Sequence, residues 1–400
     1  MISSVEKKIK YAQLPERICA WYAEHRRQLP WREERDPYRI WVSEIMLQQT
    51  RVEAVRPYYA RFLSELPDAA ALASCPEEKL LKLWEGLGYY SRVRNMQKAA
   101  RLLENGIPSD PKELQKLPGI GSYTAGAIAS IAYGVEVPAV DGNVLRILSR
   151  VTADDTDILK ASVKREAEQV LTKVLQQGSS GGSGAPGMGA PCDPGDFNQG
   201  MMDLGAGVCL PNAVPLCDKC PLADICEAHR IGRETDFPVR KKAKERRIEQ
   251  RTILVVRDGE RVALTRRQEK GLLGGMYEFP NLSGDLGKRA VLRIVEEQKL
   301  EPLHIKKLEP ARHLFSHVEW RMSGYEIRVA VFPEEMCGRI DPHETERPGT
   351  WFLAEIGQIE NTYPVPSAYR AYADYLQMKL GVRDNNKKTI GSAVGLTEGE

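Results

Sequence analysis

The sequence has 400 residues, more than one simple core organises, so we expect two or three domains. Charged residues make up an ordinary 28% and the formal net charge is +2, so most of the chain should fold and any nucleic-acid surface must be a local patch. The polar N-terminus and the absence of a long apolar run predict neither a signal peptide nor a membrane span, and therefore a cytoplasmic protein.

Residues 14–230 are expected to form a mostly helical domain, because apolar residues recur at helical spacing along much of this region. The clearest examples are Ile40–Leu47, Glu77–Trp84 and Ala125–Ala132. The first of these contains Glu44. Residues 178–195 are rich in Gly, Ser and Pro, which predicts a flexible insert without a core of its own. The helical pattern resumes at Phe197 and continues into a group of cysteines.

A basic segment at 231–250 follows, and its run of cations extends to Arg251. These cations are Arg240, Lys241, Lys242, Lys244, Arg246, Arg247 and Arg251. They form either a solvated linker or a connector that contacts DNA phosphates, and the sequence leaves both interpretations open.

Residues 251–375 show the pattern of an α+β domain. Thr252–Val256 and Arg261–Thr265 flank Asp258-Gly259, which predicts a β-hairpin. Ala290–Gln298 is expected to be a helix and Tyr325–Phe332 a strand. The polar tail at 383–400 is expected to be disordered.

Four cysteines lie close together at Cys209, Cys217, Cys220 and Cys226, with seven, two and five residues between them. Four thiolates at this spacing can surround one metal centre without long-range folding, and both zinc and a [4Fe–4S] cluster accept four cysteines. The loose, unequal spacing favours the larger cluster, with 209–226 as its loop. The remaining cysteines are scattered and are expected to be buried or incidental thiols. They are Cys19, Cys75, Cys192 and Cys337.

A helix-hairpin-helix is expected at about 114–132, where Leu117–Gly121 precedes the apolar-periodic helix. Gly119 and Gly121 allow a tight turn whose backbone N–H groups point outward at a helix N-terminus, which is a site for a DNA phosphate. Asp141 follows twenty residues after Gly121, so its carboxylate should lie close to the DNA backbone, where it can stabilise a cationic sugar.

Together, the hairpin, the position of Asp141 and the four-cysteine loop resemble the endonuclease III superfamily of base-excision glycosylases. Four further segments resemble its MutY branch, the adenine DNA glycosylases. These segments are Leu29–Arg32, Trp41–Thr50, Trp84–Arg92 and Phe197–Gln199. The resemblance covers residues 14–370 and departs from the family in two places. The first cysteine gap is one residue longer than is common, and the insert at 178–195 is unusual.

The resemblance implies that the protein hydrolyses the N-glycosidic bond of adenine mispaired with 8-oxoguanine, or with guanine, after flipping the base out of the duplex. Glu44 lies on an apolar helix face that should raise its pKa, which suits a general acid that protonates adenine. Asp141 would stabilise the sugar cation and Asn143 would orient Asp141 or water. Tyr123 occupies the position where bifunctional relatives carry a lysine, so lyase chemistry should be weak.

The same resemblance implies a set of DNA contacts, one [4Fe–4S] cluster and a monomeric, cytoplasmic, nucleoid-associated bacterial enzyme that acts on double-stranded DNA. Gln49, Leu87 and Tyr89 match positions that wedge into the base stack. The further DNA-binding candidates are Arg32, Gly119, Gly121 and Gln199.

The second domain resembles a Nudix hydrolase fold, including Gly271–Pro280, but its catalytic helix carries Leu292-Arg293 where Arg-Glu is expected. Pyrophosphate hydrolysis is therefore doubtful, although Glu296 and Glu297 remain. A lesion-recognition module is the better interpretation. Phe315, Ser316 and His317 match the family's 8-oxoguanine-recognition loop, where a hydroxyl and an imidazole can hydrogen-bond the lesion.

Three alternatives remain open. The first is a lyase for oxidised pyrimidines, which Tyr123 and the second domain disfavour. The second is a nucleotide-pool hydrolase, which Leu292 and Arg293 disfavour. The third is an iron–sulfur redox sensor without catalysis, which would leave Glu44 without a role.

Overall fold

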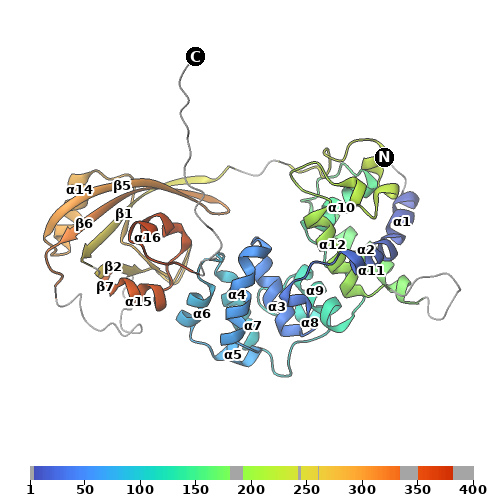
Figure 1. Ribbon diagram of the computed structural model, residues 1–400, viewed down its shortest axis with the longest axis horizontal. Coiled ribbons are helices and arrows are strands. Elements are labelled where there is room, and N and C mark those ends of the chain that lie inside the picture. Colours follow the sequence, from blue (N-terminus) through green and yellow to red (C-terminus); the bar gives the residue numbers. More distant parts are fainter. Residues whose placement is uncertain (1–3, 181–191, 242–244, 260, 334–349, 382–400) are drawn as a thin grey trace, which may run out of the picture. The chain divides into compact units, whose positions relative to one another are not determined.

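The computed structural model describes residues 4–180, 192–241, 245–259, 261–333 and 350–381 (Figure 1). Predictions made for Cys337, Lys242, Lys244, most of the insert and the tail lie outside these ranges. The chain forms two compact units. One contains Met1–Gln49, Leu66–Ser74 and Arg94–Ala243, and the other contains Thr50–Glu65, Cys75–Val93 and Lys244–Glu400.

The first unit is helical, as the apolar periodicity predicts. Along the chain up to 230, the helices are α1 (Ser4–Ala12), α2 (Leu14–His25), η1 (Pro30–Arg32), α3 (Pro37–Leu47), α4 (Val52–Glu65), α5 (Ala69–Ser74), α6 (Glu77–Trp84), α7 (Ser91–Ala100), α8 (Pro111–Leu114), α9 (Ser122–Tyr133), α10 (Gly142–Thr152), α11 (Ala161–Ser180), α12 (Pro194–Gly207), η2 (Cys217–Lys219), η3 (Ala223–Ile225) and α13 (Glu227–Arg230). The helical region therefore begins before residue 14, at α1.

The second unit is built on a mixed sheet. Its described strands are β1 (Arg247–Asp258), β2 (Arg261–Arg266), β3 (Tyr277–Glu278), β4 (Asn281–Ser283), β5 (Pro302–Leu314), β6 (Val318–Val329) and β7 (Trp351–Glu355). They follow the order β3-β2-β1-β6-β5, with β4 paired to β1 and β7 to β2. The predicted hairpin is confirmed: β1 and β2 are antiparallel, with Arg257 opposite Val262, and Gly259 adopts a φ of 73° between them.

Helices cover both faces of this sheet, and alternate residues of β1 show why. Ile253 and Val255 pack with α16 (Arg370–Tyr375), whereas Leu254 and Val256 pack with α14 (Lys288–Glu297) on the opposite face. Among the described residues after β7, this unit also has the short helices α15 (Ile356–Asn361) and η5 (Ser367–Tyr369). The long central strands are therefore hydrophobic on both sides, which explains their continuous apolar runs.

The expected boundary near 231–250 separates most of the helices from the sheet. However, α4 and α6, which precede this boundary in the chain, belong to the sheet-containing unit. Buried polar contacts hold α6 there. Lys82 Nζ donates to the Ile359 and Tyr363 carbonyl oxygens at 2.9 and 3.1 Å. The Glu85 carboxylate, 1% exposed, accepts from Val365 N at 2.7 Å. The sequence alone gives no sign of these long-range partners.

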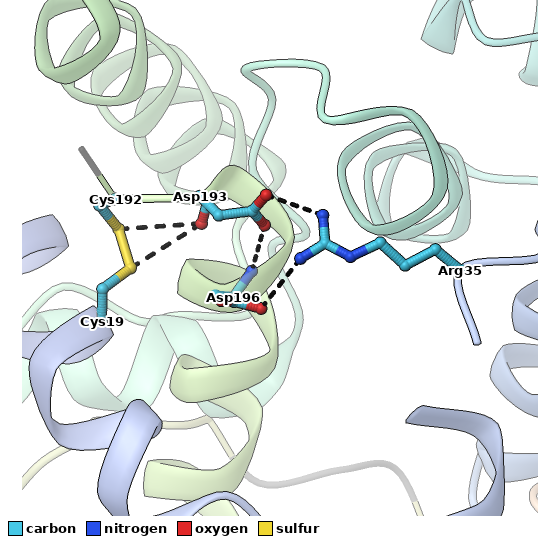
Figure 2. The surroundings of a disulfide bond; sticks show 5 residues. All are labelled: Cys19, Arg35, Cys192, Asp193 and Asp196. Carbon is cyan, nitrogen blue, oxygen red and sulfur yellow. Dashed lines mark hydrogen bonds and ion pairs between the residues drawn. A yellow bond between two sulfur atoms is a disulfide. The ribbon is translucent and has the colours of Figure 1, made fainter. Parts of the chain in front are cut away.

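The end of the insert is anchored by a disulfide between Cys19 of α2 and Cys192, whose Cα atoms are 5.7 Å apart (Figure 2). The expectation that both are incidental thiols is therefore wrong, because the fold brings together two residues that are 173 positions apart. Asp193 caps α12 by accepting from Asp196 N at 2.9 Å, and Arg35 donates to the Asp193 carboxylate at 2.8 Å. This helix begins at Pro194, three residues before the predicted start.

Replacing Cys19 with Ser should lower the free energy of unfolding by up to roughly 5 kcal/mol, because the disulfide restricts a long loop of the unfolded chain. Urea unfolding under oxidising conditions measures the loss. Adding Cys192→Ser to this variant should cost little more, since both substitutions remove one bond. Equal urea midpoints for the wild type and Cys19→Ser, with all eight cysteines titrating as thiols, would contradict the pairing.

Candidate active site and iron–sulfur loop

A buried acid lies at the centre of the helical unit. Glu44 is in the last part of α3, a helix that begins where Asp36 accepts from Arg39 N at 2.8 Å and that is buried continuously from Ile40 to Met46. Glu44 is 6% exposed. Burial raises its pKa to about 7, although the Tyr123 hydrogen bond and the charge of Arg32 lower it. A carboxyl group with this pKa can hold and donate a proton near neutral pH.

Tyr123 and Asp141 complete the surroundings of this acid. Tyr123 is the second residue of α9, and its hydroxyl hydrogen-bonds the Glu44 carboxyl group and lies 3.7 Å from Met202 Sδ. Burial and the neighbouring charges of Glu44 and Asp141 raise the pKa of Tyr123 well above its usual value. The phenol therefore remains protonated and acts as a donor. Asp141 raises the pKa of Glu44, which places the two carboxyl groups within electrostatic range of each other.

An arginine from η1 approaches the same acid. Arg32 donates to both carboxylate oxygens of Asp203 on α12, at 2.5 and 2.9 Å, and Asp203 is 3% exposed. Burial alone would raise the pKa of Asp203, but Arg32 and Arg27 outweigh it and lower that pKa. Arg32, predicted as a DNA contact, is thus held in a buried ion pair with only 10% of its side chain exposed. From this position its charge lowers the pKa of Glu44, although burial outweighs it.

Asp141 is the N-cap of α10. Its Oδ1 accepts from the backbone N–H groups of Asn143 and Val144 at 2.8 and 2.9 Å, and its Oδ2 accepts from Asn143 Nδ2 at 2.7 Å. Three donors fix the orientation of the carboxylate at a helix N-terminus, where the dipole favours negative charge. Asn143 thus contacts Asp141 directly, at the position where the sequence predicts an orienting residue.

A chain of hydrogen bonds leads from Asp141 to the cysteine loop. Arg146, 2% exposed, donates to Asn143 Oδ1 at 3.0 Å, to the Gly205 carbonyl at 2.8 Å and to the Cys209 carbonyl at 2.9 Å. Gly205 is required here because a Cβ at that position would lie 2.7 Å from Asn143 Cβ. The arrangement of the first cysteine and that of Asp141 are therefore linked through one buried guanidinium group.

The four clustered cysteines line one pocket with apolar side chains of α10 and α12. Arg150 Nη1 donates to Cys209 Sγ at 3.1 Å. Burial is the main cause that raises the pKa of the Cys217 thiol to about 11 and that of Cys220 to about 12, and the neighbouring thiols raise both further. These mutual effects show that the thiols lie close to one another, and all four line the same pocket. The longer first gap is absorbed, because Cys209 converges with the other three.

The predicted hairpin lies between α8 and α9. Gly119 adopts a φ of 80°, a conformation that favours glycine, and a Cβ there would lie 2.8 Å from Asn95 Cβ. Gly121 is the N-cap of α9, with open space around it.

Gln49, just after α3, is exposed with a φ of 59°, an unusual conformation for a non-glycine residue. Gln199, in contrast, is only 8% exposed.

In the other unit, the structure brings a predicted wedge residue next to the predicted lesion loop. Phe315–His317 forms the turn between β5 and β6, and Ser316 Oγ hydrogen-bonds Tyr89 Oη at 3.4 Å. Tyr89 is 44% exposed with a φ of 48°, whereas Leu87 is 6% exposed. Phe315 packs edge-on against Trp320 at 4.9 Å, so the exposed Ser316 and His317 are presented from a fixed base.

Sequence reasoning missed Asp203, Arg146 and Arg150. The two arginines are four residues apart on α10, among mainly apolar buried neighbours, and both are at most 4% exposed. Charged side chains at core positions of a periodic pattern are the signal that identifies such residues, since buried charge must have partners. The partners themselves cannot be deduced from the pattern.

Comparison with known proteins identifies one domain family for the helical region and another for the sheet-containing region. Residues 42–173 match the family model for the HhH-GPD superfamily of base excision DNA repair proteins, and residues 252–375 match the NUDIX domain model. The fold and the site thus define a multidomain base excision repair protein with a helix-hairpin-helix domain followed by a Nudix-like domain, which confirms the predicted fold class.

Three curated relatives identify the branch. Adenine DNA glycosylase from Rattus norvegicus is 33% identical over 374 residues, which cover 78% of this chain and 70% of the relative. The enzyme from Mus musculus is 31% identical over 93% of this chain and 79% of the relative. That from Buchnera aphidicola subsp. Schizaphis graminum is 29% identical over 87% of this chain and 93% of the relative.

The chain belongs to the adenine DNA glycosylase family. It is a DNA N-glycosylase, a hydrolase of base excision repair that removes adenine from DNA, which confirms the activity class expected from the sequence motifs. Among the described helices, none combines the length and apolar character needed to cross a bilayer.

Proposed function

We propose that this enzyme excises adenine mispaired with 8-oxoguanine, or with guanine, in duplex DNA, with Glu44 as the general acid. The observation that carries the proposal is the burial of Glu44, which raises its pKa to about 7 beside Tyr123 and within electrostatic range of Asp141. This is a pair of carboxyl groups with different environments, the arrangement on which acid-assisted glycosidic cleavage depends.

In the proposed reaction, the adenine is first flipped out of the duplex, because its ring nitrogens are otherwise stacked between base pairs. Glu44 donates its proton to a ring nitrogen of adenine, and the bond between that base and the sugar C1′ breaks with its electron pair leaving on adenine. Asp141, held by three donors, stabilises the positive charge that develops on the sugar. Water then adds to C1′ and its proton returns to Glu44.

We further propose that the enzyme is monofunctional, without strand-cleaving lyase activity. Tyr123 stands at the position of the lysine in bifunctional relatives, and a phenol cannot form a Schiff base with the sugar. Its hydroxyl is instead engaged with Glu44, and its raised pKa keeps it protonated. Tyr123 therefore supports the acid.

For duplex DNA, we propose contacts at the hairpin around Gly119 and Gly121, at Gln49 and at Tyr89. The hairpin offers backbone N–H groups at the N-terminus of α9 for a phosphate. Gln49 and Tyr89 are exposed and held at positive φ, which suits residues that insert into the base stack. Leu87, Gln199 and Arg32, the other DNA-binding candidates, are largely buried within their own units. The enzyme is proposed to act as a monomer in the bacterial cytoplasm.

Replacing Glu44 with Gln should slow adenine release by about 10²- to 10⁴-fold, because the amide has no proton to donate. Single-turnover release from a duplex with an 8-oxoguanine:adenine pair measures this effect. In the wild type, release should fall as the pH rises through about 7, where Glu44 loses its proton, and the variant should lose this dependence. Duplex affinity should be unchanged. Near-normal release by the variant would refute the mechanism, and an equal loss of affinity would show a structural role.

We propose that Cys209, Cys217, Cys220 and Cys226 hold one [4Fe–4S] cluster. Four thiols that line one pocket fit this group, and Arg150 offsets the negative charge that the thiolates acquire when metal replaces their protons. Bound there, the cluster supplies structural cross-linking of the loop. Arg146 hydrogen-bonds both Cys209 and Asn143, so an ordered Cys209 would also help to fix the position of Asn143.

Purified protein should contain about four iron atoms per chain and be yellow-brown, as expected for this cluster. Cys217→Ser should lose the colour and DNA affinity together, because the loop loses its cross-link. Cys75→Ser is the matched control: this cysteine belongs to the sheet-containing unit, away from the cysteine loop, and its replacement should leave the iron content unchanged. Stoichiometric zinc without iron would overturn the assignment.

The Nudix-like domain is proposed to recognise 8-oxoguanine through Ser316 and His317, on the turn that Phe315 anchors. Both side chains are exposed, and a hydroxyl and an imidazole can together donate to and accept from the lesion's carbonyl and N–H group. The hydrogen bond from Ser316 to Tyr89 would place the lesion contact beside the residue proposed to insert into the stack.

Ser316→Ala combined with His317→Ala should reduce the preference for 8-oxoguanine over guanine opposite adenine by about 5- to 150-fold, as expected for the loss of one or two good hydrogen bonds. The ratio of single-turnover rates on the two duplexes gives this preference. Glu309→Ala, an exposed substitution on β5, is a control expected to leave the ratio unchanged. An unaltered preference in the double variant would exclude this loop from lesion recognition.

A further inference from the structure

The loop that joins α6 to α7 carries Tyr89, the residue proposed to insert into the base stack. Its backbone is tightly turned, with φ values of 104° at Gly86, 69° at Gly88 and 48° at Tyr89. The Gly88 carbonyl accepts from Trp84 Nε1 and from Arg92 Nη2, both at 3.1 Å. Because these donors come from the two flanking helices, the loop keeps its shape as a unit, and its position depends on how the end of α6 is held.

Glu85 lies between α6 and this loop, and its buried carboxylate accepts from three donors. Oε1 accepts from Val365 N at 2.7 Å, and Oε2 accepts from Gly381 N and from Lys82 Nζ, both at 2.9 Å. Val365 and Gly381 belong to the segment after β7, in the same compact unit. Moving Glu85 would deprive a buried charge of its hydrogen bonds, which is costly. Glu85 therefore ties the start of the loop to the segment after β7.

The backbone packs closely at the same place. A Cβ at Gly86 would lie 2.1 Å from Tyr58 Oη and 3.7 Å from Gly381 Cα. A Cβ at Gly381 would lie 2.5 Å from the Glu85 carbonyl oxygen and 2.6 Å from Tyr58 Oη. Gly381 also has a positive φ, of 70°, so conformation and lack of space both favour glycine at the two positions. The first residue after Glu85 is thus packed against the segment that binds the Glu85 carboxylate.

The lesion-recognition turn contacts the opposite end of the loop, where Ser316 Oγ hydrogen-bonds Tyr89 Oη. This bond is 3.4 Å long and both residues are exposed, so it is weak and cannot fix the loop alone. The contacts of the buried Glu85 carboxylate are shorter and are made away from water, which strengthens them. The contact that determines the position of the loop is therefore the one at Glu85.

We propose that Glu85 is a positioning residue, through which the Nudix-like domain holds Tyr89 in place for insertion into the duplex. The inference rests on the proposed insertion of Tyr89. A loop that is already fixed loses little conformational entropy when it enters the base stack, so more of the binding energy is left to unstack the adenine. The lesion contact at Ser316 and the insertion at Tyr89 then share one frame. The second domain thus contributes to opening the duplex as well as to reading the lesion.

The test measures how fast the full-length protein unstacks the target base. The duplex carries 2-aminopurine in place of the adenine opposite 8-oxoguanine, and its fluorescence rises when the base leaves the stack. Glu85→Gln keeps the size of the side chain, but its amide nitrogen cannot accept from Val365 N or Gly381 N. At saturating protein, the rate of the fluorescence rise should fall by roughly tenfold, the effect of losing about one hydrogen bond to a charged group.

Further variants separate positioning from general stability. Tyr89→Ala should slow the rise at least as much as Glu85→Gln, and combining the two should slow it no further, because Glu85 acts through Tyr89. Glu78→Gln is the matched control: this carboxylate, at the other end of α6, accepts from Tyr277 Oη, and its replacement should leave the rate unchanged. If Glu85→Gln does not fold, Lys82→Met together with Glu85→Gln removes both buried charges and takes its place in the test.

Multiplicative effects of Glu85→Gln and Tyr89→Ala in the combined variant would overturn the inference, because the two residues would then act independently. An equal slowing by Glu78→Gln would overturn it as well. So would a wild-type rate with Glu85→Gln beside a slow rise with Tyr89→Ala, a result that leaves the insertion of Tyr89 intact. A wild-type rate with Tyr89→Ala would instead refute the insertion itself, and the inference with it.

Discussion

The burial of one carboxyl group, that of Glu44, constrains the rest of the helical unit. Because its pKa is raised from 4.5 to about 7, the folded state binds a proton that the unfolded chain has already released between these values. Stability from this group is therefore fully present below pH 4.5 and is lost as the pH rises through about 7. The surrounding helices must offset this cost, and α3, α9 and α12 do so by packing tightly around the acid.

The same constraint accounts for the polar residues nearby. Tyr123 donates to this acid and lowers its pKa, but burial is the larger effect, so Glu44 keeps its proton up to about pH 7; the raised pKa of Tyr123 keeps the phenol itself protonated. Arg32 would favour the ionised form of Glu44, but its charge is balanced by Asp203. Asp141 experiences a different environment, at a helix N-terminus with three donors, so the two carboxyl groups are chemically distinct.

The sequence predicts the elements of this structure better than their partners. Glu77–Trp84 was expected as a helix and forms α6 over those residues, and the Asp258-Gly259 turn joins β1 and β2. Local spacing determines these features. By contrast, the placement of α6 in the sheet-containing unit depends on Lys82 and Glu85 meeting backbone atoms about 280 residues away. The Cys19–Cys192 disulfide and the ion pair between Arg32 and Asp203 likewise depend on tertiary contacts that no periodicity encodes.

The disulfide also reduces how much the position of α12 depends on the chain segment that precedes it. With Cys192 bound to α2 and Asp193 capping the helix, the start of α12 is held by residues 192 and 193 themselves. Loop-closure entropy grows only logarithmically with length, so each doubling of this segment should cost roughly 0.6 kcal/mol. The number of residues that join α11 to Cys192 can therefore vary at little energetic cost while Gln199, Met202 and Asp203 keep their places, which makes this connection a tolerant insertion point next to a helix whose Asp203 holds the Arg32 guanidinium group.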